Sequence, residues 1–349
     1  MSQTNQLPIS SPLSLGDLLD RAFRLYRARF GLFLLTAAIF QVPLGIISGL
    51  FTGNFMIGYM DMIENIAQNP GEQPEVVMNE MLVPLIGYAG GVMLVSIIWL
   101  ILNGIVSLAL TSQSIATLHQ EEQTLAQSLR TGWNRFWTYL LMNVLRFLGI
   151  GVTTIGVLLA MMFIGVVIAF VVGPFLGDGP NFSGGSGGLG EAAGMIGFMI
   201  LFCCIYILAI AIFLGPILYL AARWIVATPG IVEQKWKAGE SLRESWLLTR
   251  DYAWRCIGYL VLLSLLSFLI ISLPQIIFQQ LLTMLLPTEF AELVFTLSTV
   301  LGSLFNVVWQ PFYIAAVVLL YYDLRVRKES YDLELQLQQL ESEVEQPQL

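Results

Sequence analysis

Residues 293–322 read LVFTLSTVLGSLFNVVWQPFYIAAVVLLYY and contain no charged side chain. A helix that crosses a bilayer needs about 20 mainly apolar residues, and this stretch exceeds that length. Working outward from it, we find five further apolar stretches of similar length. We expect transmembrane helices at 30–51, 83–110, 150–175, 194–221, 257–283 and 295–321. The sequence therefore predicts an all-α integral membrane protein with six transmembrane helices.

The composition agrees with lipid as the solvent for most of the chain. Of the 349 residues 56% are apolar and only 11% are charged, whereas a soluble domain carries about 25% charged residues. The net charge is −8 and there is no long basic run, which argues against a nucleic-acid partner. Residues 1–13 are polar and four arginines precede the first apolar stretch. A secretory signal that is removed does not have this pattern, so we expect the first span to be retained.

The basic residues predict the orientation of the spans. All 16 lysines and arginines lie before span one, between spans two and three, between spans four and five, or after span six. The other connections, near 52–82, 176–193 and 284–294, carry acidic residues and no basic ones. Basic segments stay in the cytoplasm. Both termini are therefore expected to be cytoplasmic.

Three of the basic segments resemble one another. They are SLGDLLDRAFRLYRARFGLFL at 14–34, TLAQSLRTGWNRFWTYLL at 124–141 and AGESLRESWLLTRDYAWRCIGYL at 238–260. Each has a leucine, two residues, a small residue and an aromatic residue, and the copies are spaced by 110 and 113 residues. Apolar residues recur at intervals of three and four, which is typical of an amphipathic helix. The pattern predicts such a helix before spans 1, 3 and 5, and a threefold internal repeat.

An amphipathic helix of this kind lies in the plane of the membrane interface. Its arginines would then meet lipid phosphates, and its aromatic residues would lie at headgroup level. The alternative is that these helices pack on one another as a cytoplasmic cap, and both arrangements are compatible. The candidate interfacial lipid contacts are Arg21, Arg24, Arg27, Arg130, Arg135, Arg243, Arg250, Trp133 and Trp246.

Several spans contain neutral polar residues, which are costly in hydrocarbon unless they find partners. The ordinary explanation is hydrogen bonding between helices. The alternative is a cavity for a lipid headgroup or a small solute, and its best candidates are Asn306, Trp309 and Gln310 beside Pro311. The other polar residues within spans are Gln41, Asn103, Gln275, Gln279 and Gln280.

No catalytic, metal-binding or cofactor-binding residue is predicted. His119 is the only histidine, and a solvated loop position is its expected setting. No pair of acids lies within a span, which argues against a proton relay. The three cysteines are interpreted as small core residues. The glycine-rich segment 176–191 lacks the strand that precedes a phosphate-binding loop and is interpreted as a flexible linker.

We treat residues 1–349 as a single membrane domain. It comprises a flexible N-terminus at 1–13, a six-span helical bundle at 14–322 and a charged cytoplasmic tail at 323–349. A short helix is expected near 55–67 in the connection after span one. The apolar stretch 137–176 is too long for one simple span, so a cytoplasmic extension is expected to enter the bilayer near Gly149 and Gly151. The tail is expected to extend span six as a frayed amphipathic helix and to end in a disordered EVEQPQL.

Three segments carry a resemblance to a known family. They are LSLGDLLDRAFRLYRARFGLFL, TPGIVEQKWKAGESLRESWLLTRDYAWR and LLYYDLRVRKESYDLELQ. The chain resembles, over roughly residues 10–340, the membrane domain of glycerophosphoryl diester phosphodiesterase and related bacterial six-span proteins. In some members this domain precedes a soluble phosphodiesterase barrel, whose activity requires histidines and acids that bind a divalent metal. With one histidine in this chain, the resemblance implies the membrane domain without that catalytic domain.

These observations predict a non-catalytic polytopic protein of the bacterial cytoplasmic (inner) membrane that organises lipid or a membrane protein partner. The alternative is a passive transporter or lipid-translocating protein with a polar cavity among its spans. The expected partners are membrane lipids and a membrane or cytoplasmic protein, with no nucleic acid and no cofactor.

Overall fold

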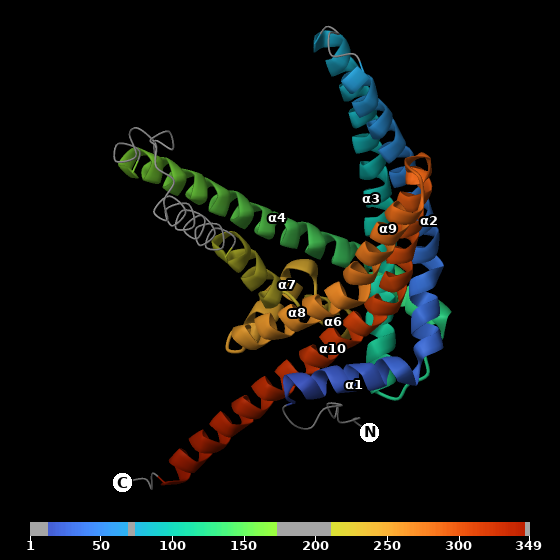
Figure 1. Ribbon diagram of the computed structural model, residues 1–349. Helices are drawn as coiled ribbons and strands as arrows, with labels where there is room; N and C mark the ends of the chain where they lie inside the picture. Colours follow the sequence, from blue (N-terminus) through green and yellow to red (C-terminus); the bar gives the residue numbers. More distant parts are fainter. Residues whose placement is uncertain (1–12, 69–73, 173–210, 346–349) are drawn as a thin grey trace, which may run out of the picture. The chain divides into compact units, whose positions relative to one another are not determined.

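The computed structural model describes residues 13–68, 74–172 and 211–345 (Figure 1). The regular elements in these ranges are all helical. Six helical segments are long and apolar enough to cross a membrane, which confirms the predicted six-span all-α class. Their bounds are Phe30–Met60, Ile86–Leu118, Leu125–Phe163, Ala211–Glu233, Ala253–Leu285 and Ala291–Lys328.

The chain divides into two compact units. One comprises Met1–Met142 and Ile225–Leu349, and the other is Asn143–Trp224. Within the smaller unit, the described residues are 143–172 of one helix and 211–224. These two segments approach closely at Gly149, where an added Cβ would lie 2.7 Å from the Trp224 ring. The smaller unit therefore has an internal helix contact of its own.

The larger unit contains helices from both ends of the sequence. Its N-terminal elements are α1 (Leu15–Ala28), α2 (Phe30–Gln68), α3 (Pro74–Leu118) and the first part of α4 (Leu125–Val172). Its C-terminal elements are α6 (Ala227–Glu233), α7 (Ala238–Thr249), α8 (Ala253–Ser267), η2 (Phe268–Ser272), α9 (Leu273–Leu285), η3 (Thr288–Phe290) and α10 (Ala291–Glu345). Figure 1 shows α2, α3 and α10 running side by side, and α1 also packs on α10. The last helix is thus the centre of this unit.

Small residues allow α2 and α10 to approach closely. Gly45, Gly49 and Gly53 follow one another at intervals of four, so they share one face of α2. An added Cβ would lie 2.0 Å from Ser303 Oγ at Gly45 and 3.0 Å from a backbone oxygen of α10 at Gly49. Thr296 Oγ1 also donates a 3.1 Å hydrogen bond to the Gly49 carbonyl. Glycine faces of this kind are typical of helix pairs within membranes.

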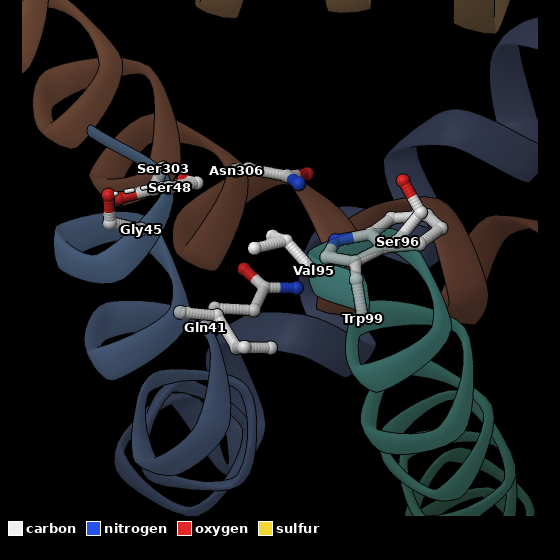
Figure 2. Close-up of a pocket in the computed structure, with 9 residues that line it drawn as sticks. Gln41, Gly45, Ser48, Val95, Ser96, Trp99, Ser303 and Asn306 are labelled. Atoms are coloured by element: carbon white, nitrogen blue, oxygen red, sulfur yellow. Dashed lines mark hydrogen bonds between the residues drawn. The ribbon is translucent and has the colours of Figure 1, made fainter. Parts of the chain in front are cut away.

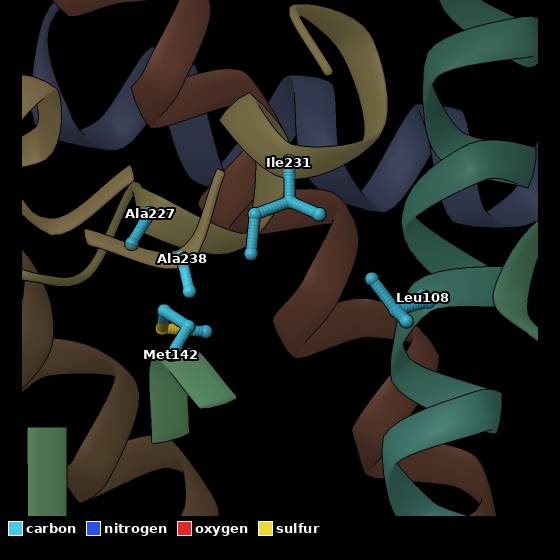
Figure 3. Packing of buried hydrophobic residues seen from close by; sticks show 5 residues of the cluster. All are labelled: Leu108, Met142, Ala227, Ile231 and Ala238. Atoms are coloured by element: carbon cyan, nitrogen blue, oxygen red, sulfur yellow. The ribbon is translucent and has the colours of Figure 1, made fainter. Parts of the chain in front are cut away.

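A second packing centre joins α3, α4, α6 and α7. The buried side chains of Leu108, Met142, Ala227, Ile231 and Ala238 form this cluster (Figure 3). This cluster packs the short α6–α7 segment against the first part of α4. Helices α3 and α4 also approach closely at Gly132, where an added Cβ would lie 2.6 Å from the Ile105 carbonyl oxygen. The segment 227–249 is therefore part of the packed unit.

The three related segments differ in the structure. In the first copy α1 is a separate helix, because the backbone of Arg29 leaves helical geometry before α2 begins. In the third copy α7 ends at Thr249, and α8 begins at Ala253 after a turn. In the second copy α4 continues without a break from Leu125 to Val172. The expectation of a separate helix before span three is wrong, because residues 137–148 contain neither glycine nor proline to end it.

The connection after span one is also shorter than expected. Residues 52–68 continue α2 and residues 74–82 belong to α3, so most of the predicted connection at 52–82 is helical. The expected short helix near 55–67 is the end of α2. No proline or charge interrupts residues 50–60, and the first span therefore extends to Met60.

Packing continues past the predicted start of the tail at residue 323. Asp323 and Leu324 are fully buried, and α10 runs on to Glu345. At the other end of the chain Leu13 is 6% exposed. Several segments lie outside the described part of the chain, namely residues 1–12, the glycine-rich segment 176–191, Cys203, Cys204 and residues 346–349.

Candidate functional site

Polar side chains from three helices meet inside the larger unit. The Gln41 amide on α2 donates a hydrogen bond to the side-chain oxygen of Gln310 on α10. Gln310 in turn donates to Asn103 Oδ1 at 2.6 Å and to Ser107 Oγ at 3.3 Å, both on α3. These contacts are the interhelical hydrogen bonds that neutral polar residues form in membranes. They tie α2, α3 and α10 together at one level.

That level lies well inside the candidate spans. Gln41 follows Phe30, the first residue of α2, by eleven positions, which corresponds to about 16 Å along a helix. Asn103 and Gln310 lie near the middle of Ile86–Leu118 and Ala291–Lys328. The hydrocarbon core is about 30 Å thick. The polar cluster is therefore about halfway along the spans.

A cavity of about 370 Å³ borders this cluster. Asn306, Trp309 and Gln310, the three cavity residues predicted from the sequence, all lie on its wall. Its other lining residues come from α3, α4, the fifth span and α10, and they are Trp99, Asn103, Ser107, Tyr139, Ser267, Ile271, Tyr313 and Ile314. None of the lining residues is charged. The chemistry of the wall is that of amides, hydroxyls and aromatic rings.

The fifth span changes its helical geometry beside this cavity. Residues Phe268–Ser272 form a π-helical segment between α8 and α9. Pro274 follows it and has no N–H with which to continue the regular bonding. Short π segments of this kind are frequent at functional sites. Here the segment contributes Ile271 to the cavity wall.

A second cavity of about 180 Å³ adjoins the first, and Trp99 and Asn306 line both. Its polar residues are Gln41, Ser48, Ser96, Ser303 and Asn306. Figure 2 shows the Gln41 amide directed into the space between α2 and α3, below Asn306. The Gln41 side-chain oxygen is buried and has no hydrogen-bond partner among the described residues. It is an acceptor that a ligand could satisfy.

Asn306 differs from the other amides of this region. It lines both cavities, and its side chain makes no hydrogen bond within the described part of the chain. Its amide therefore offers two donors and an acceptor to whatever enters. Gln310, in contrast, is occupied by the bonds to α2 and α3. The sequence does not separate the free amide of Asn306 from the bonded amide of Gln310.

The predicted lipid contacts lie mostly on the surface. Trp133 is 65% exposed, and the neighbouring Trp137 is 75% exposed. Arg24, Arg27, Arg130, Arg243 and Arg250 are exposed, whereas Arg21, Arg135 and Trp246 are half-buried. Arg24 also pairs with Asp20 at 2.7 Å. The exposed members are available to lipid, and the structure does not gather all nine at one place.

Helix α1 begins with a capping box formed by Ser14 and Asp17. The Ser14 hydroxyl accepts the Asp17 N–H at 3.1 Å, and the Asp17 carboxylate accepts from the Ser14 N–H and hydroxyl. The hydrogen bond with the Ser14 side chain is the largest cause that lowers the pKa of Asp17 below its ordinary value, and the bond with the Ser14 backbone is the next. A capping box of this kind fixes the start of a helix. It orients α1 ahead of the first span.

A buried ion network, which the sequence did not reveal, joins the first residues to the last span. The Asp323 carboxylate accepts the Leu13 N–H at 2.8 Å and pairs with Arg255 and Arg327, each at 3.0 Å. Both arginines also donate to the Leu13 carbonyl. The Asp323 side chain is fully buried, and each arginine side chain is 20% exposed. This clamp fastens three distant segments.

A second network surrounds Tyr322. Its hydroxyl donates to Glu233 on α6 and lies 3.1 Å from His119 Nε2. Arg325 pairs with the same glutamate at 3.5 Å. His119 is exposed, as expected for a loop residue, but it contacts Tyr322 in addition to solvent. No group of three or more His, Cys, Asp or Glu residues in the described ranges is arranged to hold a metal ion.

Comparison with known proteins bears on residues 198–346. These match the sequence profile of the membrane domain of glycerophosphoryl diester phosphodiesterase. This part of the chain is similar to that family. The match confirms the resemblance inferred from the sequence and concerns the family's membrane domain rather than its catalytic domain. It includes α10, which contributes residues to the polar wall and to both ion networks.

No curated protein and no solved structure matched the chain. The phosphodiesterase membrane-domain family and the six apolar helices identify a polytopic membrane protein.

Proposed function

We propose that this chain is a non-catalytic membrane protein that binds lipid, and that the uncharged polar cavity between α3 and α10 receives the hydroxylated part of that ligand. The observation that carries the proposal is the free amide of Asn306, which lines both cavities and has no partner within the described residues. An unpaired polar group in hydrocarbon is costly. A ligand that supplies hydrogen bonds at this point removes that cost.

The wall chemistry supports an uncharged polar ligand. Amide and hydroxyl groups on the wall donate and accept hydrogen bonds, whereas no lysine, arginine or carboxylate lines either cavity. Trp99 and Trp309 provide flat apolar surfaces. Ligand sites are commonly apolar with a few well-placed polar groups. A lipid with hydroxyl groups and a free polyol share the required chemistry.

The surface of the protein supports lipid as the source of the ligand. Trp133 and Trp137 expose large aromatic surfaces on one helix, and arginines are exposed on α1, α4 and α7. Exposed tryptophan and arginine are the residues that favour the membrane interface. We accordingly propose that the protein resides in the bacterial cytoplasmic membrane, with both termini in the cytoplasm.

The test is retention of lipid by the full chain in mild detergent, measured by native mass spectrometry. We expect bound lipid with the wild-type protein and a loss of at least about tenfold with Asn306→Leu, which removes no hydrogen bond within the protein. Asn54→Leu is the matched control, because Asn54 is exposed on α2 and lies outside both cavities. Equal lipid retention by Asn306→Leu and Asn54→Leu would overturn the proposal.

A second candidate is passive translocation of a small polyol. The observation that favours it is that the two cavities adjoin at Trp99 and Asn306 and follow one another along α3 and α10. Glycerol flux into proteoliposomes measures it. Flux that exceeds protein-free vesicles and falls with Asn306→Leu supports translocation, and flux equal to that of empty vesicles rules it out for glycerol.

A further inference from the structure

A third cavity lies away from the polar cluster, where the α6–α7 turn meets α10. Its volume is about 200 Å³, and it shares no lining residue with the other two cavities. Its wall is formed by Gln234, Trp236, Glu244, Leu248, Tyr321, Arg325 and Lys328. A water molecule takes about 30 Å³ of liquid volume. The space is therefore large enough for a group of several heavy atoms.

The two charges of opposite sign that line this cavity have no partner. Neither Glu244 nor Lys328 forms a hydrogen bond or an ion pair with another residue in the described ranges. Both side chains are half-buried. Charges that are partly removed from water are favoured when they are paired. An unpaired cation and an unpaired anion on one wall indicate a ligand that carries both charges.

The other cation of the wall is already engaged. Arg325 pairs with Glu233 at 3.5 Å and lies 5.8 Å from the centre of the Tyr321 ring. It therefore forms part of the wall and leaves Lys328 as the cation available to an anionic group.

The aromatic side chains suit the cationic end of such a ligand. Trp236 and Tyr321 meet edge to face, with ring centres 6.3 Å apart. Gly230 makes room for Trp236, since an added Cβ would lie 2.0 Å from the indole ring. Aromatic faces attract ammonium groups. The turn thus holds Trp236 against α10 beside Glu244.

We propose that this cavity binds a zwitterion that carries a primary ammonium and a phosphate a few bonds apart. The ammonium lies by Glu244 and the aromatic rings, and the phosphate lies by Lys328. Two sources supply this chemistry, namely the headgroup of phosphatidylethanolamine and free phosphoethanolamine. Lys328 follows the charge-free stretch 293–322 by six positions, about 9 Å along a helix, and this closeness to the predicted membrane surface favours the lipid.

The experiment measures binding to the full chain in detergent with three probes. These are dihexanoyl phosphatidylethanolamine, dihexanoyl phosphatidylglycerol and free phosphoethanolamine. Binding of each probe is measured by the shift that it causes in the unfolding temperature of the protein. We expect the ethanolamine lipid to bind at least about tenfold more tightly than the glycerol lipid, since only the former pairs with both charges. If free phosphoethanolamine also binds, the headgroup alone is sufficient for binding. If only the lipid binds, the membrane is the source of the ligand.

Charge reversal provides the decisive variants. Lys328→Glu and Glu244→Lys should each abolish the preference for ethanolamine lipid, and the double variant should recover part of it because both charges are again present. Lys328→Met and Glu244→Gln repeat the test with milder changes if a reversal unfolds the protein. Glu121→Lys, on an exposed loop residue, is the control and should leave the preference unchanged.

Equal affinity for the two lipids in the wild-type protein, or an unchanged preference in both single variants, would overturn the proposal. The inference is independent of the proposed function. Asn306→Leu should leave ethanolamine binding unchanged, so failure at one cavity is distinguishable from failure at the other.

Discussion

At the residue scale, Asp323 contributes more to the structure than its place in the sequence suggests. It follows the apolar stretch 293–322 directly and was assigned to a charged tail. Its side chain is instead fully buried between Arg255, Arg327 and the Leu13 backbone. A buried carboxylate is tolerated only when its oxygens are paired. Here both oxygens have partners.

We expect Asp323→Asn to destabilise the protein by about 3 kcal/mol or more, because it leaves two partly buried arginines without their anion. Thermal unfolding in detergent, followed by circular dichroism, measures the change. Asp20→Asn is the matched control, since Asp20 forms an exposed pair with Arg24 and such pairs contribute little. A similar unfolding temperature for both variants would contradict this role of Asp323.

Ser14→Ala should raise the pKa of Asp17 towards its ordinary value, because the bonds from Ser14 are the first causes of its lowering. A lowered pKa means that the folded state favours the carboxylate, so the cap is complete at neutral pH. Its contribution is lost as the pH falls through the folded pKa, below the ordinary value of 3.8. Carbon-13 NMR of labelled aspartate measures the titration. No difference between the two proteins would refute the cap as the cause.

At the element scale, α2 and α10 pack closely because α2 has glycines, which carry no side chain, on the face toward α10. Gly49 faces a backbone carbonyl of α10 at a distance that leaves no space for a larger residue. Gly58, further along the same helix, has no neighbour within 4 Å of an added Cβ. The two positions look alike in the sequence and differ only in what lies opposite.

Gly49→Leu is expected to cost about 1–3 kcal/mol through overpacking against α10. Gly58→Leu should leave the stability unchanged or raise it slightly, because leucine is the better helix former. The comparison uses the same unfolding assay with both purified variants. Equal destabilisation would mean that α2 and α10 do not approach at Gly49.

The elements also show where sequence reasoning succeeded and where it failed. Charge-free stretches located the spans, because the cost of a charge in lipid acts on each residue locally. The grouping of Asn306, Trp309 and Gln310 followed from the same cost. The partners of Asp323 could not be predicted, since Leu13 lies 310 residues away. The continuity of α4 was missed because a repeated sequence motif does not require a repeated break.

At the scale of the whole molecule, the distribution of charge remains the best guide to orientation. The clamp around Asp323 and the network around Glu233 both lie at the ends of helices where the basic residues are concentrated. These ends are the predicted cytoplasmic side. Residues 61–80, between the first two spans, carry acidic residues and no basic ones.

Single cysteines test this orientation in a variant without the three native cysteines. We expect a cysteine at Glu121 to resist an impermeant maleimide in intact cells and to react after lysis, because the connection between spans two and three is predicted to face the cytoplasm. A cysteine at Glu64, which follows the first span and is exposed, should react to a similar extent in both conditions. Labelling of Glu121→Cys in intact cells would reverse the assignment.

The bond between Leu13 and Asp323 has a consequence for biosynthesis. Residues near the start of the chain leave the ribosome first, yet their anchor is made only when the sixth span is nearly complete. Until then the Leu13 backbone and Arg255 lack their common acceptor. The anchor of Leu13 therefore forms only after a further 310 residues, up to Asp323, have been synthesised.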